Sequence, residues 1–159
     1  MDNNLRRFLK FFWILSIFMF LFSLLYTYAG FPDQVNTFSG KSGDLILSKG
    51  GLFYIALITF VLVNTVFLVL NRMLNNYLGA SSGKLSLKKV SISGWINGFL
   101  FIINFFIISI LYFLFNINQQ GTENFSTIGM MVMATAALLL GWLVYLAFIL
   151  IRAPKPVID

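Results

Sequence analysis

The sequence predicts an all-α integral membrane protein, an up-and-down four-helix bundle with both termini in the cytoplasm. Of its 159 residues, 59% are hydrophobic and 10% are charged, whereas a soluble domain carries about a quarter charged residues. Four long stretches have apolar cores without any charged residue, and each approaches or exceeds the roughly 20 residues of a membrane-spanning helix. We therefore expect one membrane domain over 1–159, with spans at about 9–28, 52–71, 93–116 and 125–151.

The basic residues sort to one side of these spans. Membrane proteins retain Lys and Arg on the cytoplasmic side, and nine of the eleven basic residues lie in the N-terminus, the loop 72–92 or the C-terminal tail. We therefore place these segments inside and the loops 29–51 and 117–124 outside. Within the loop 72–92, Lys84, Lys88 and Lys89 would lie near anionic lipid headgroups. The richness in Phe, Ile, Asn and Lys is typical of an AT-rich bacterial genome, so the expected location is the bacterial inner (cytoplasmic) membrane.

The first span has an alternative interpretation. A basic N-terminus followed by an apolar run that ends in Thr27-Tyr28-Ala29 is similar to a signal peptide with a small-residue cleavage site. The run is longer than the apolar region of about 7–15 residues in a signal peptide, and it contains many aromatic side chains, so we favour an uncleaved span. Cleavage would leave three spans with the same sidedness.

Asparagines are the polar residues that stand out inside the predicted spans. Asn64 and Asn71 lie on the second span, and Asn97 and Asn104 lie on the third; the members of each pair are seven residues apart and share a helix face. In an antiparallel helix pair, the residue numbers of any two residues at equal depth add up to the same total. Asn64 and Asn104 give the same total as Asn71 and Asn97, so each of these pairs is expected to lie at one depth. Because an unpaired amide is costly in hydrocarbon, we predict that these amides zip spans two and three into an αα-hairpin. A polar site for a ligand headgroup is the alternative.

Small residues lie four apart on the third and fourth spans. Gly94 and Gly98 form a GxxxG motif, and Ala137 and Gly141 form a weaker pair. Such pairs allow helix backbones to approach closely, so we expect packing within the bundle, with packing against another subunit as the alternative. Aromatic residues near the predicted boundaries are expected to anchor the spans at the interfaces, among them Tyr28, Tyr54, Trp95, Trp142 and Tyr145.

Several classes of function lack their usual residues. The chain has no Cys and no His, which removes thiolate chemistry, the commonest metal ligand and the usual general base at neutral pH. The apolar cores of the spans, which begin at Phe11 in the first, contain no Asp, Glu, Lys, Arg or His, the residues that mark proton relays and ion pathways. The carboxylates of the predicted outer loops stand one at a time. We therefore expect no catalytic, cofactor-binding or metal site, and no enzyme activity.

The first outer loop carries a short motif. Pro32 ends the helical run, Val35 and Phe38 could pack onto the bundle, and several glycines permit turns, so we expect a loop packed on the outer face. The motif residues are Phe31, Pro32, Asp33, Val35, Phe38, Gly43 and Asp44. They resemble the first outer loop of DUF1648-type bacterial membrane domains, although Asn36 replaces the expected proline and Thr37 the expected histidine. The resemblance implies a role in immunity, because some domains of this type belong to the immunity protein of the sporulation-delay toxin. Those relatives protect cells against a membrane-active peptide and act in signalling.

These observations favour a non-enzymatic multi-span membrane protein. It would be a small accessory, assembly or immunity-like component that acts through helix packing and its outer loop. The alternative is a small transporter or a lipid- or peptide-binding protein that uses the asparagine-lined seam, and an intramembrane enzyme ranks third. The expected partners are the lipid bilayer and either other membrane subunits or a homo-oligomer, and we expect no nucleic acid.

Overall fold

The computed structural model describes residues 3–40, 43–77, 84–120 and 125–151. These residues form, in chain order, α1 (Asn3–Gly30), β1 (Gln34–Gly40), β2 (Gly43–Ser48), α2 (Lys49–Tyr77), α3 (Lys84–Gln120) and α4 (Phe125–Ile151). All four helices are long and apolar enough to cross a membrane, in agreement with the predicted helical class. The first three helices are longer than the predicted spans, and the short hairpin of β1 and β2 was not predicted.

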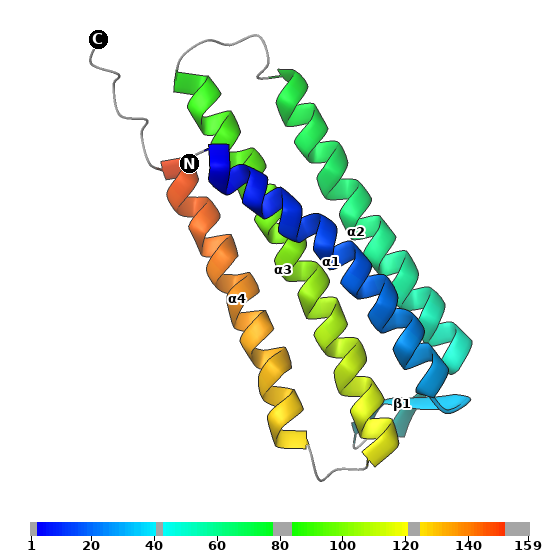
Figure 1. Cartoon of the computed structure of the whole chain (residues 1–159). Helices are drawn as coiled ribbons and strands as arrows, with labels where there is room; N and C mark the ends of the chain where they lie inside the picture. The colour runs from blue at the N-terminus through cyan, green and yellow to red at the C-terminus, as the bar shows by residue number, and fades with distance from the viewer. Residues whose placement is uncertain (1–2, 41–42, 78–83, 121–124, 152–159) are drawn as a thin grey trace.

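The helices alternate in direction, so that α1 and α3 run one way and α2 and α4 run the other (Figure 1). Helix α3 contacts each of the other three helices and has its most extensive contact with α1, whereas the described part of α4 contacts only α3. Half of the α3 span is buried, compared with 6% of the α4 span. The molecule is therefore a central helix surrounded by three others, rather than a bundle in which every helix has two equivalent neighbours.

Each of the helices α1 and α2 packs through a single narrow stripe. The buried residues of α1 are spaced three or four apart, and those of α2 are spaced four apart, which places each set on one helix face. They are Ser16, Phe20, Leu24 and Thr27 on α1, and Leu52, Ala56, Phe60 and Asn64 on α2. In α3, by contrast, all eight residues 93–100 are buried. Two complete turns of α3 are thus covered on every side, as its central position requires.

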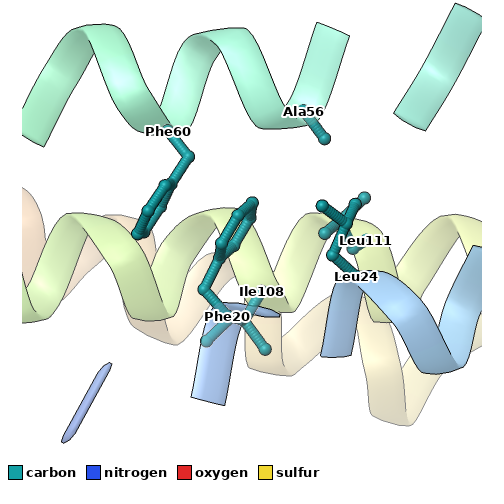
Figure 2. Packing of buried hydrophobic residues seen from close by; sticks show 6 residues of the cluster. All are labelled: Phe20, Leu24, Ala56, Phe60, Ile108 and Leu111. Atoms are coloured by element: carbon teal, nitrogen blue, oxygen red, sulfur yellow. The ribbon is translucent and has the colours of Figure 1, made fainter. Parts of the chain in front are cut away.

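A compact apolar cluster joins α1, α2 and α3 (Figure 2). The rings of Phe20 and Phe60 stack face to face, with centroids 3.9 Å apart and an interplanar angle of 4°. Leu24 and Ala56 continue the cluster toward the hairpin, where they meet Ile108 and Leu111 of α3. The close fit of these side chains holds the three helices together through van der Waals packing.

The β-hairpin lies across the end of the bundle where α1 ends and α2 begins, here called the hairpin end (Figure 1). Its two strands pair antiparallel, with an irregularity between Asn36 and Phe38 that leaves Thr37 as a bulge. The Thr37 hydroxyl donates to the backbone oxygen of Leu45 at 2.8 Å across this bulge. At the start of α2, the Ser48 hydroxyl accepts a hydrogen bond from the backbone N–H of Gly51 at 3.1 Å, as an N-cap residue does.

Candidate functional site

The most polar buried site lies near the middle of the spans and joins three helices. Asn64 of α2 donates to Asn104 of α3 at 2.8 Å, and Asn104 donates back to Asn64 at 3.3 Å. The predicted Asn64–Asn104 contact is therefore confirmed. Asn104 is fully buried and Asn64 is 7% exposed, so the two amides form a reciprocal pair away from solvent.

Two residues of α1 complete this polar cluster, which we define as Trp13, Ser16, Asn64 and Asn104. The Trp13 indole N–H donates to the Asn64 side-chain oxygen at 3.0 Å, and Asn104 donates to the Ser16 hydroxyl at 2.9 Å. Sequence reasoning missed α1 here. A signal was present, because Trp13 and Ser16 are three residues apart and share a helix face, but nothing in the sequence gave their depth relative to the asparagines.

Every N–H and O–H of the polar cluster has a partner within the chain. The second amide hydrogen of Asn64 goes to the Phe60 backbone oxygen at 2.9 Å, and the Ser16 hydroxyl donates to the Trp13 backbone oxygen at 2.7 Å. Both amide groups thereby use both of their hydrogens. The cluster has no spare donor with which to hold a ligand, and its arrangement is that of a joint between helices.

The second predicted amide pair does not form a hydrogen bond. The side-chain oxygen of Asn71 accepts from Asn75 on the same helix at 3.5 Å, and among the described residues no hydrogen bond joins Asn71 to Asn97. Asn97 is buried on α3 at 5% exposure. Of the two points of the predicted zipper, the hydrogen bonds of the described residues thus show one, between Asn64 and Asn104, and the facing of Asn71 and Asn97 stays a prediction.

A second interhelical joint fixes α4 to α3. The indole N–H of Trp95 donates to the backbone oxygen of Trp142 at 2.7 Å, and the indole N–H of Trp142 donates to the backbone oxygen of Trp95 at 3.0 Å. Trp95 is only 5% exposed, so this residue is not the interfacial anchor expected from the sequence. The reciprocal bonds are favoured because a buried indole N–H needs an acceptor.

The GxxxG motif of α3 lies at this second joint. A Cβ atom added to Gly98 would meet the Trp142 ring at 2.3 Å, so the glycine provides the space that the indole fills. Gly94 is also buried. The expected packing within the bundle is therefore observed for the motif on α3, and its partner is an aromatic ring rather than a second small residue.

The small residues of α4 lie elsewhere. Ala137 and Gly141 are exposed, and nothing lies within 4 Å of a Cβ added to Gly141. The expectation that this pair packs within the bundle was wrong, because Trp142, Leu139 and Leu146 supply the face of α4 that contacts α3.

The motif of the outer loop anchors the hairpin to the bundle. Phe31 and Val35 are buried, at 6% and 0% exposure, and they pack with Leu52 and Leu114. The backbone oxygen of Asp33 accepts from the N–H of Lys49 at 3.0 Å, which closes the base of the hairpin. The expected packing of Val35 is therefore observed. Pro32 and the Asp33 side chain are exposed.

The remaining motif positions lie on the two strands of the hairpin, toward residues 41–42. Phe38, Gly43 and Asp44 belong to the paired strands, but their side chains are outside the described part of the structure, as are those of Lys84, Lys88 and Lys89 on α3. The packing expected of Phe38 and the headgroup contacts expected of the three lysines thus stay predictions.

Two polar side chains of α3, which sequence reasoning missed, fix the hairpin end. Asn118 accepts from the backbone N–H of Asn36 at 2.9 Å and donates to the backbone oxygen of the same residue at 3.1 Å. Its amide thereby occupies the edge of β1 as a neighbouring strand would. Gln119 donates to the backbone oxygen of Gly30 at the end of α1. The hairpin and α1 are thus both tied to the end of the central helix.

The described residues contain no group of three or more His, Cys, Asp or Glu side chains that could hold a metal ion. A shallow surface crevice lies at the hairpin end between α1 and α2, too small to enclose a water molecule. Lys49 lies at this crevice with its ammonium 4.8 Å from the ring centroid of Tyr28, a cation–π arrangement. Comparisons of the chain with protein families, curated proteins and solved structures give no match.

Proposed function

We propose that this chain is a non-catalytic, multi-pass membrane protein that presents its hairpin at the outer face of the cytoplasmic membrane. It would act as an accessory or immunity-like component through that hairpin and through its exposed helix faces. The observation that carries this proposal is the closed polar cluster. All its donors have partners within the chain, and four of these hydrogen bonds join α1, α2 and α3. The buried polar groups therefore serve cohesion and leave recognition to the surface.

The attachment of the hairpin supports the same proposal. Its base is closed by a backbone bond at Lys49, its inner face packs through Val35, and its β1 edge is held by Asn118. A loop with no task beyond connecting two helices needs none of these contacts, and fixed segments lose less conformational entropy when they bind a partner. The hairpin therefore has the properties of a preorganised recognition element.

The distribution of charge supports an orientation with the hairpin outside. Arg7 and Lys10 on α1 and Arg72 on α2 lie toward the ends of their helices that are remote from the hairpin, and basic residues are retained in the cytoplasm. The resemblance to DUF1648-type loops supports an immunity-like role, in which the partner would be a membrane-active peptide. In this orientation the hairpin faces the side from which such a peptide arrives.

A transporter that uses the asparagine seam is the alternative. It would require the polar cluster to open to water, which would break the reciprocal bonds between Asn64 and Asn104. The two proposals differ in the accessibility of one position. A cysteine introduced in place of Ser16, in this chain that lacks native cysteine, should resist water-soluble maleimides if the cluster is a joint and should react if it lines a pathway.

The orientation and the recognition role can be tested with single-residue probes. Cysteine at Asn36, on the exposed face of the hairpin, should react with an impermeant maleimide in intact cells, whereas cysteine at Asn76, at the other end of α2, should react only after permeabilisation. A photo-crosslinking amino acid at Gln34 should give a discrete adduct with a protein or peptide, and the same probe at the lipid-facing Ile58 should not. Equal labelling of both cysteines, or adducts from Ile58 alone, would contradict the proposal.

A further inference from the structure

Strand β2 has an unpaired outer edge. In an antiparallel pair, opposed residues alternate between those that bond to each other and those whose peptide groups point outward. Asn36 lies opposite Ile46, and the peptide groups of Asn36 point outward to Asn118. The N–H and C=O of Ile46 therefore point outward on the other side, toward an edge that no third strand covers in the two-stranded sheet of the described residues.

The side chain at this edge is also uncovered. Val35 and its cross-strand neighbour Leu47 face the bundle, so Ile46, which follows the alternation of the strand, faces away from it. Ile46 is 50% exposed. An edge strand with an exposed apolar residue is a template for pairing unless Lys, Pro or a bulge blocks it, and the segment 45–48 contains neither Lys nor Pro, while the bulge lies on β1.

We propose that β2 pairs antiparallel with β2 of a second copy of this chain, centred on Ile46, to form a continuous four-stranded sheet. The outward N–H and C=O of each Ile46 would bond to those of the other, and the two exposed side chains would lie side by side. This inference does not depend on the proposed function, since it concerns only the edge of the hairpin.

The geometry of the fold favours a second copy as the occupant. Antiparallel strands of equal sequence are related by a two-fold axis perpendicular to their sheet. One face of this sheet packs on the end of the bundle, so the axis would run along the helices, and both copies would cross the membrane in the same sense. Two-fold symmetric dimers are the commonest homo-oligomers.

Disulfide crosslinking tests the register, because the chain has no native cysteine. In the proposed pairing the two Cα atoms of residue 46 are about 5.5 Å apart, within the range of about 4.4–6.8 Å for a disulfide. The two Cα atoms of residue 45 would be about 8 Å apart, because they are offset along the strands by two residues. Leu45 is as exposed as Ile46, at 57% compared with 50%, which makes it a matched control.

The experiment uses the full chain in lipid vesicles with a mild oxidant. I46C should give a covalent dimer at least tenfold faster than L45C. In a second measurement, single-molecule photobleaching of labelled protein in vesicles, I46P should lower the dimer fraction and I46V should not, since proline removes only an outward N–H at this position. Equal crosslinking of I46C and L45C, or unchanged dimerisation of I46P, would each overturn the proposal.

Discussion

Among the single substitutions that preserve side-chain size within the polar cluster, Asn104→Leu should destabilise the protein most. The substitution removes three hydrogen bonds, two to Asn64 and one to Ser16. Interhelical hydrogen bonds in membranes contribute about 0.6 kcal/mol each on average, and the amide hydrogen left unpaired on Asn64 costs about 1–3 kcal/mol. We expect the free energy of unfolding to fall by roughly 3–5 kcal/mol when these terms combine.

A double-mutant cycle separates the amide pair from its surroundings. Asn64→Leu alone should also be costly, because it leaves the Trp13 indole N–H and one hydrogen of Asn104 without acceptors. With both asparagines replaced, neither amide is stranded, so the double variant should lose less stability than the two single losses combined, with a coupling of about 1–2 kcal/mol. Matching apolar replacements at both partners are often nearly neutral.

The assay is unfolding by sodium dodecyl sulfate in mixed micelles, followed by tryptophan fluorescence and by circular dichroism. The matched control is Ser109→Ala, because Ser109 is fully buried on the same helix but its hydroxyl bonds only to the Phe105 backbone oxygen of that helix, at 2.8 Å. We expect the control to change stability by less than about 0.5 kcal/mol. If Asn104→Leu behaves like this control, or if the two asparagine substitutions add without coupling, the interpretation of the cluster as a joint is wrong.

Two further predictions concern the other attachments. Gly98→Ala should destabilise the protein by about 1–3 kcal/mol, because the added Cβ would lie 2.3 Å from the Trp142 ring. Gly141→Ala is the control, because Gly141 has open space around it, and it should leave the unfolding midpoint unchanged. Equal unfolding midpoints for the two variants would contradict the packing of Gly98 against Trp142. Asn118→Ala should speed amide hydrogen exchange at Asn36 at least tenfold, since it removes the acceptor of that N–H, while Asn116→Ala, which loses a bond within its own helix, should not.

Some features of the site followed from the sequence. The contact between Asn64 and Asn104 could be predicted because polar groups in hydrocarbon seek partners and because consecutive spans of similar length place them at equal depth. The packing of Gly98 could be predicted in kind, since small residues mark close approach. The identity of its partner, the ring of Trp142 on α4, could not, because no pattern in the sequence relates the depth of α4 to that of α3.

Other features were beyond sequence reasoning because they depend on contacts between distant segments. Trp13 and Ser16 of α1 join amides that lie 51 and 88 residues away along the chain. The hairpin depends on Asn118, which is 82 residues from Asn36. The glycines of this loop indicated turns, but no local pattern marked two paired strands, and the amide that completes the β1 edge belongs to a helix.

The sequence by itself determined the four helices, the sorting of basic residues and the depth of the central amide pair, because length, charge and polarity act locally in a bilayer. Only the tertiary structure decided that α3 is central, that α1 shares its polar cluster and that the described part of α4 contacts α3 alone. The physical reason is that a helix in lipid can be apolar on every side, so its hydrophobic pattern does not show which face meets another helix. That choice depends on shape and on hydrogen-bond partners, which exist only once the helices are packed.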